Sequence, residues 1–150
     1  MDNTTSPVSC DTPCPAVDRE HDIIVKAMAG LYAAVLEHRS SDVIGPLIDL
    51  VVRFCTEHFS HEEGLMRECG YAHADSHASA HQFLMGQILD LKKRCLRDEL
   101  PSAVDVMRLL RGLSEHCDIW DRQAVHAIQE SIRDRRRNER AELALAALAS

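Results

Sequence analysis

The spacing of the apolar residues limits what this chain can fold into more than any other feature. Four segments place apolar or histidine side chains at alternating steps of three and four residues, which lines one face of an α-helix. A repeat of about 3.5 residues is typical of helices that pack as coiled coils do. The four stripes are His21, Ile24, Met28, Leu31 and Val35; Leu47, Val51, Phe54, His58, Glu62 and Leu65; His77, His81, Leu84, Ile88, Leu91 and Cys95; and Val106, Leu109, Leu113, His116 and Trp120.

These stripes predict helices over residues 18–38, from 41–46 to about 70, over 75–98, and from about 102 onward. Pro46 falls in the first turn of the second helix, where proline is tolerated, and Gly70 suits a helix C-cap. Pro101 separates the last two helices. Because short joins make consecutive helices antiparallel neighbours, we expect an all-α, up-down-up-down antiparallel four-helix bundle.

The two ends of the chain differ from the segments between them. Residues 1–17 hold three prolines and many small polar residues, and predict a flexible, disordered N-terminal arm. The bundle is expected over residues 18–130. Residues 131–150 carry a run of arginines and then an Ala/Leu-rich stretch, which favours a solvated helical extension over an anion-binding segment. The Ala/Leu end is expected to lie on the bundle or to pair two copies as a homodimer.

Composition and charge argue against several classes of protein. The formal net charge is −7, which argues against a nucleic-acid partner. No apolar run reaches the roughly 18–20 residues of a membrane span, and the N-terminus lacks the basic-then-apolar pattern of a signal peptide. A cytoplasmic location without a membrane partner is therefore expected. The six cysteines form no CxxC pair and are expected to stay reduced.

Five of the nine histidines occupy stripe positions, on all four predicted helices. In an up-down bundle, positions equally distant from a connecting loop face each other. His21 lies 19 residues before residue 40 and His58 lies 18 after it, while Glu62 and His81 are equally far from the next join. At 1.5 Å per residue such offsets amount to at most a few ångströms. One layer is predicted, with His77 one turn away; it comprises His21, His58, Glu62, His81, His116 and Asp121.

The spacing within each helix decides which of these side chains can reach a common site. His58 and Glu62 are four residues apart, as are His77 and His81, so each pair shares a helix face. His116 and Asp121 are five apart and diverge by about 140° in a regular helix. Asp121 therefore requires either an approach from one side of the site or a local irregularity of the helix.

This donor set indicates a metal centre. Clustered imidazoles buried without partners are costly, and a metal gives each ring nitrogen a partner. Five imidazoles and two carboxylates exceed the four ligands of a zinc ion, and calcium and magnesium prefer oxygen. Two metals that favour octahedral coordination fit the set if they share both carboxylates and one water-derived oxygen. Three histidines then give one metal six ligands, and two histidines give the other five, which leaves one open position. Neither HExxH nor Glu-x-x-His occurs, which argues against a zincin and a ferritin-like di-iron site.

The same residues resemble the hemerythrin family. Residues 58–66, His-Phe-Ser-His-Glu-Glu-Gly-Leu-Met, match the pattern HFxxEExLM, and His77-x-x-x-His81 and His116-x-x-x-x-Asp121 follow. Residues 18–21, Asp-Arg-Glu-His, resemble the ligand motif of the first helix. The resemblance covers about residues 18–126, fills all seven ligand positions, and is to the single-domain bacteriohemerythrins in particular.

The resemblance implies two non-haem irons joined by an oxo or hydroxo bridge, with dioxygen as the ligand. It implies that His77, His81 and His116 hold the six-coordinate iron and that His21 and His58 hold the five-coordinate one. Glu62 and Asp121 would bridge them. The pocket for dioxygen should be apolar, and four residues are candidates for its wall: Phe59, Met66, Leu113 and Cys117. Cys117 stands where the family commonly has isoleucine.

The leading functional hypothesis is reversible dioxygen binding by a carrier, store or delivery protein that is not an enzyme. The alternatives are oxygen or redox sensing through a partner, a di-iron enzyme that reduces nitric oxide or peroxide, and iron storage. A metal-free interaction module is the reading the filled site favours least. His38, His61, His73 and His126 lie off the shared layer and are expected at the surface.

Overall fold

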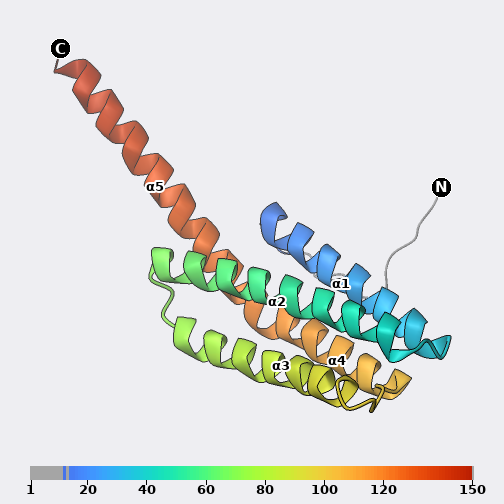
Figure 1. The fold of residues 1–150 in the computed structure, drawn as a ribbon. Helices are drawn as coiled ribbons and strands as arrows, with labels where there is room; N and C mark the ends of the chain where they lie inside the picture. The colour runs from blue at the N-terminus through green and yellow to red at the C-terminus, as the bar shows by residue number, and fades with distance from the viewer. Residues whose placement is uncertain (1–11, 13, 150) are drawn as a thin grey trace.

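A computed structural model describes Thr12 and residues 14–149 of the chain. Within these residues the chain is built of helices joined by short turns, in the up-down-up-down order expected (Figure 1). The elements are α1 (Pro15–Leu36), α2 (Ser41–Cys69), α3 (Ala74–Cys95), α4 (Ala103–His116), a π-helical turn η1 (Cys117–Asp121) and α5 (Arg122–Leu148). The last three elements follow one another without a loop and form one continuous helical segment, which is the predicted fourth helix and its extension.

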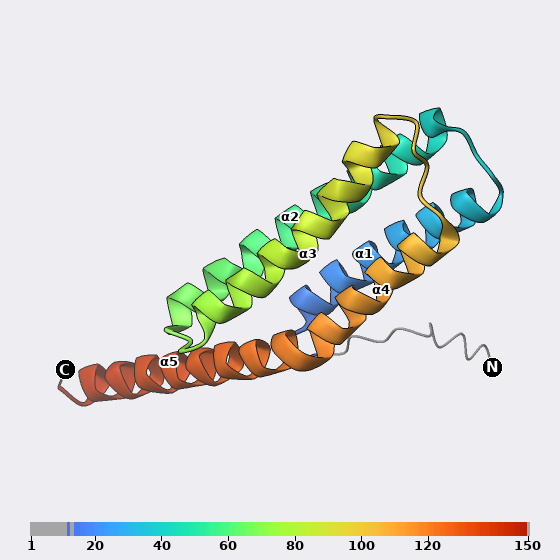
Figure 2. The same ribbon diagram turned by 90° about the horizontal axis from the view of Figure 1, so that it is seen from below.

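Each bundle helix packs against two neighbours: α1 and α3 both contact α2 and α4. Figure 2 shows α2 beside α3 and α1 beside α4. Local signals set the ends of these helices. Gly70 ends α2 in the left-handed region at φ 67°, a conformation that glycine adopts without strain. Ser102 begins α4 with a capping box, in which it and Asp105 each accept the other's backbone N–H.

The core has three levels along the bundle axis. A large apolar cluster fills the end near the α1–α2 and α3–α4 joins, with Leu31, Ile48 and Ile88 among its fully buried members. A small cluster of Met66, Ala124 and Ile128 lies at the opposite end. Between them lie the buried polar residues, so the functional layer is closed by apolar packing above and below.

The predicted stripes of α1 and α3 are buried at every position. In α2 the prediction was partly wrong, because Leu47, Phe54 and Leu65 are only half-buried. The buried positions beside them are Ile48, Cys55 and Met66. This helix faces both α1 and α3, so its buried surface is wider than a single seam.

The N-terminal boundary also differs from the expectation. Helix α1 begins at Pro15, three residues early, since proline at the first helical position needs no hydrogen bond on its nitrogen. Asp18 accepts hydrogen bonds from the backbone N–H and the hydroxyl of Thr12, both at 2.7 Å. The rest of the predicted arm, residues 1–11 and 13, lies outside the described residues.

Beyond the bundle, α5 continues as a single helix away from the other four (Figure 1). Residues 133–149 are exposed, and Leu143, Leu145 and Leu148 are among them. Among residues 14–149, no helix joins the length and the apolarity needed to cross a membrane.

Candidate metal centre

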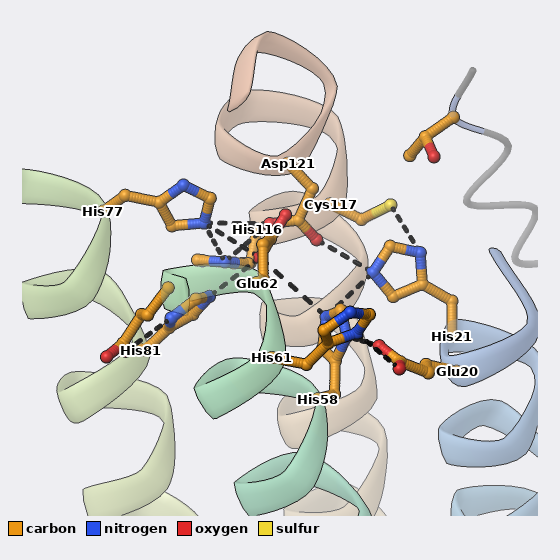
Figure 3. Close-up of polar contacts among 12 residues, drawn as sticks. Glu20, His21, His58, His61, Glu62, His77, His81, His116, Cys117 and Asp121 are labelled. Carbon is orange, nitrogen blue, oxygen red and sulfur yellow. Dashed lines mark hydrogen bonds and ion pairs between the residues drawn. The ribbon is translucent and has the colours of Figure 1, made fainter. Parts of the chain in front are cut away.

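All seven predicted ligand residues are buried and converge in the middle layer of the bundle (Figure 3). They come from every helix of the bundle, as expected for one layer that crosses all four helices. Glu62 and His77 have no exposed surface at all. The Nε2 atoms of the five histidines point inward, where they contact one another and the two carboxylates.

Asp121 reaches the layer because the helix is irregular between it and His116. The residues that follow His116 form the π-helical turn η1, which is the local helix irregularity that the five-residue spacing allowed. A π-turn inserts one residue into a turn, so positions five apart come onto the same face. The same turn leaves Trp120 half-buried, with its ring 5.7 Å from that of His77.

Three donor atoms form a nearly equilateral triangle on one side of the layer. His77 Nε2 lies 3.0 Å from His116 Nε2, and Asp121 Oδ1 lies 3.0 Å from the first and 2.9 Å from the second. Donors bound about 2.1 Å from one metal at right angles lie about 3.0 Å apart. The triangle therefore has the dimensions of one face of an octahedral coordination shell.

The other side of the layer holds His21 and His58, whose Nε2 atoms are 3.1 Å apart. Asp121 connects the two sides, since its Oδ2 lies 3.0 Å from His21 Nε2 while its Oδ1 faces His77 and His116. Glu62 lies between the sides as well: its Oε2 is 3.3 Å from His81 Nε2 and 4.0 Å from His58 Nε2. Both carboxylates thus occupy positions from which they can bridge two cations.

Several of these donors have no hydrogen-bond partner among the described residues. They are both carboxylate oxygens of Glu62, Nδ1 of His77 and Nε2 of His81. An unsatisfied buried polar group costs roughly 1–3 kcal/mol, and more when charged. Such a concentration of orphaned atoms in an otherwise apolar core fits a bound cation pair.

The acid–base behaviour of the metal-free site reflects the same burial. Burial, followed by the nearby charge of Asp121, raises the pKa of Glu62 to about 7. Burial also lowers the pKa of His81 to about 4. For Asp121 burial opposes ionisation, but hydrogen bonds from His116, His21 and His77 outweigh it and hold the pKa well below its usual value. Cations bound between the two carboxylates would favour their ionised forms.

Two further carboxylates hold the outer edges of the ligand rings. His58 Nδ1 donates to Glu20 Oε2 at 2.9 Å, and His81 Nδ1 donates to Glu63 Oε1 at 3.0 Å. Glu20 lies in the first-helix motif of residues 18–21 and Glu63 in the motif of residues 58–66, but the sequence predicted no role for either. Their signal was adjacency in the chain, since each stands next to a ligand, His21 in one case and Glu62 in the other.

A small apolar cavity borders the layer on the side of His21 and His58. Its volume is about 20 Å³, enough for a ligand of one or two heavy atoms. Besides four of the ligand residues, its wall consists of apolar side chains: Ile24, Val25, Phe59, Leu110 and Leu113. His116 and Asp121 also border the cavity, whereas His77 and His81 do not, so the cavity lies mainly on the side of His21 and His58.

Of the four residues predicted to line the pocket, the structure places Phe59 and Leu113 in the cavity wall. Met66 lies elsewhere, in the small apolar cluster with Ala124 and Ile128, because it is one helical turn beyond Glu62. Cys117 does not border the cavity, and its Sγ lies 3.8 Å from Nδ1 of His21. Phe59 also stacks on His81, with ring centroids 4.1 Å apart.

The four histidines expected at the surface are all exposed, namely His38, His61, His73 and His126. His61 nevertheless connects to the layer, because its Nδ1 donates to Glu20 Oε1 at 2.7 Å. Glu20 therefore joins one surface histidine to one histidine of the site (Figure 3).

Comparison with known proteins identifies the family. The family model "Hemerythrin HHE cation binding domain" matches residues 12–144, nearly the whole chain. The chain belongs to the hemerythrin family. A bacteriohemerythrin from Stenotrophomonas maltophilia (strain R551-3) is 28% identical to it over 78 residues. That match covers 52% of this chain and 50% of the relative, so the chain aligns with about half of the relative's length.

Solved hemerythrin structures share the fold of this chain. A crystal structure of wild-type hemerythrin superimposes with a TM-score of 0.74 at 22% identity, covering 85% of this chain and 97% of the hemerythrin. A leucine-to-phenylalanine variant gives the same TM-score at 21% identity, covering 85% and 96% of the two chains. The hemerythrin fold thus covers 85% of this chain.

Proposed function

We propose that this hemerythrin-family chain binds dioxygen reversibly at a pair of iron ions, as a carrier, store or delivery protein. His77, His81 and His116 would hold one iron, and His21 and His58 the other. Glu62 and Asp121 would bridge them together with an oxo or hydroxo group. When bound, iron would supply redox chemistry, and this chain would offer one histidine fewer to the iron held by His21 and His58 than to the other.

The observation that carries the proposal is the placement of the apolar cavity. It borders His21 and His58, the half that the donor count leaves one ligand short, as well as His116 and Asp121, and it has room for a ligand of one or two heavy atoms. The chain thus positions free space and an incomplete ligand set on the same side of the layer.

The cavity wall also favours binding over catalytic turnover. Its five residues outside the ligand set are all apolar and offer no proton to a bound molecule. Phe59, Leu110 and Leu113 exclude water, which would otherwise promote loss of the bound ligand and oxidation of the iron. A reductase for nitric oxide or peroxide needs protons and an electron donor, and this wall supplies no proton.

The deciding experiment is anaerobic reconstitution with ferrous iron, followed by iron counting and visible absorption through cycles of air and argon. We expect two irons per chain and an absorption band that forms in air and disappears under argon. A single irreversible conversion to the ferric form would overturn reversible binding and favour the enzyme or storage alternatives. Failure to load two irons would overturn the ligand assignment itself.

Substitution of Leu113 tests the role of the cavity separately from the metal. Leu113→Ala removes part of its wall, so dioxygen should dissociate and the iron should autoxidise several-fold faster while two irons remain. Leu89→Ala is the matched control, since Leu89 lies on α3 with 38% of its surface exposed. Equal rates in both variants would contradict the assignment of the pocket.

The exposed tail supports one further part of the proposal, the pairing of two copies through α5. Leu143, Leu145 and Leu148 are each at least two-thirds exposed, on the part of α5 that extends beyond the bundle. Sedimentation velocity should show a dimer that Leu145→Glu converts to a monomer. A monomeric wild-type protein would remove this part and leave the oxygen chemistry untouched.

A further inference from the structure

The two halves of the layer are held from outside by the same device. On one flank, Glu20 of α1 accepts a hydrogen bond from Nδ1 of His58 on α2. On the other, Glu63 of α2 accepts one from Nδ1 of His81 on α3. Each bond crosses between two helices, and each fixes one histidine in a different half. Figure 3 shows the bond between Glu20 and His58.

These bonds set the tautomer of each ring. A neutral imidazole carries one N–H, and a carboxylate oxygen can only accept. The proton therefore resides on Nδ1 in His58 and His81, and the lone pair on Nε2 faces the centre. In the other three histidines the contact is on the opposite ring nitrogen. Asp121 accepts hydrogen bonds from Nε2 of His116, His77 and His21, which favours the Nε2–H tautomer in these rings.

Each glutamate uses one carboxylate oxygen for the buried histidine and the other for a basic side chain at the surface. Glu20 Oε1 accepts from Nδ1 of His61, which is 42% exposed. Glu63 Oε2 lies 3.8 Å from the guanidinium of Arg67, which is 68% exposed. The glutamates themselves are only 31% and 27% exposed, against 2% for His58 and His81. The order from solvent to layer is thus basic side chain, carboxylate, histidine on both flanks.

We propose that Glu20 and Glu63 are positioning residues, each presenting one histidine to one cation of the pair. Glu20 serves the half that contains His21 and His58, and Glu63 serves the half that contains His77, His81 and His116. His61 and Arg67 only support the carboxylates. The proposal rests on the ligand assignment of the proposed function, but not on the binding of dioxygen.

The first test uses the metal-free protein and long-range ¹H–¹⁵N correlation NMR of the imidazole rings. His58 and His81 should show the Nδ1–H tautomer in the wild-type protein. Glu20→Ala should abolish that preference in His58 alone, and Glu63→Ala in His81 alone. Glu20→Gln should retain it, because the amide oxygen still accepts. Unchanged tautomers in both alanine variants would overturn the proposal, whether or not the protein binds metal.

The second test measures ferrous iron affinity anaerobically by competition with a chromogenic chelator. Loss of a carboxylate that holds a ligating histidine typically costs 10–100-fold in metal affinity. Each alanine variant should weaken one of the two irons by roughly that factor, and the double variant should weaken both. Two irons weakened equally by one substitution would contradict the division between the halves.

Matched controls separate positioning from general effects. Glu57 precedes His58 in the chain as Glu20 precedes His21, but it is exposed, so Glu57→Ala should change neither tautomer nor affinity. His61→Ala and Arg67→Ala should leave both irons bound. If the wild-type protein loads two irons without reversible dioxygen binding, the proposed function fails while these results still decide the role of the two glutamates.

Discussion

The apolar end of the bundle and its polar middle layer are built on opposite principles. Near the α1–α2 join the core is dry and apolar, and side chains such as Leu31, Ile48 and Ile88 fill it completely. At the level of His77 and Glu62 the core holds seven ionisable side chains, and three of them, Glu62, His77 and His81, carry polar atoms without a hydrogen-bond partner among the described residues. The apolar end contributes stability through burial, whereas the polar layer costs stability until cations complete it. Function is concentrated where folding is least favourable.

The largest effect is expected at the bridging carboxylates. Glu62→Ala or Asp121→Ala removes the shared ligand between the halves, so iron content should fall from two per chain to one or none. The metal-free variant should still fold, because the apolar end is intact. Iron analysis and circular dichroism check both points, and an unchanged iron content would disprove the bridging role.

The reverse result is expected at the apolar end. Ile48→Ala leaves a cavity in a fully packed cluster and should cost about 2–5 kcal/mol in the free energy of unfolding. Two irons should still bind, since Ile48 contributes nothing to the ligand layer. Urea denaturation and iron counting on the same sample measure the two properties. A loss of iron from the folded variant would show that the apolar end and the ligand layer are not independent.

A smaller, pH-dependent effect should come from Glu62 in the metal-free protein. Its pKa in the fold is raised to about 7, so between about pH 4.5 and 7 the folded state binds more protons than the unfolded one. Stability from this group is therefore lost as the pH rises. Glu62→Gln cannot ionise, so its advantage over wild type should be near zero at pH 4.5 and grow to about 3 kcal/mol above pH 7.

Comparing the two proteins at each pH cancels the contributions of ionisable groups far from Glu62. His81 has the opposite sign, because its lowered pKa makes the unfolded state the better proton acceptor below about pH 6.5. Because His81 and Asp121 lie against Glu62, the difference measures Glu62 together with its coupling to these two groups. A difference that stays constant with pH would contradict the raised pKa of Glu62.

The smallest effect is expected far from the layer, at the start of α4. Ser102→Ala removes one side of the capping box with Asp105 and should cost about 1 kcal/mol in the free energy of unfolding. Iron affinity and the dioxygen cycle should not change. Thermal denaturation provides the measurement, and a change in iron binding would indicate that the end of the bundle near this cap communicates with the layer.

The sequence predicted most of the fold and the full set of candidate ligands. The stripe through His77, His81, Leu84 and Ile88 is buried at each position, because helical period alone decides which residues share a face. The symmetric distances from the loops brought His21 level with His58 and Glu62 level with His81. Met66, which the sequence predicted for the pocket, lies one helical turn past Glu62 on α2, in the small apolar cluster with Ala124 and Ile128.

The sequence by itself determined the helices, the buried faces and the donors on them, since these follow from local periodicity and short connections. Only the tertiary structure decided how the donors are completed. It placed the π-turn before Asp121, the cavity beside His21 and His58, and the bonds from His58 to Glu20 and from His81 to Glu63. Glu20 and His58 are 38 residues apart, and their contact depends on how two helices rotate and slide when they pack. Periodicity within one helix carries no information about that.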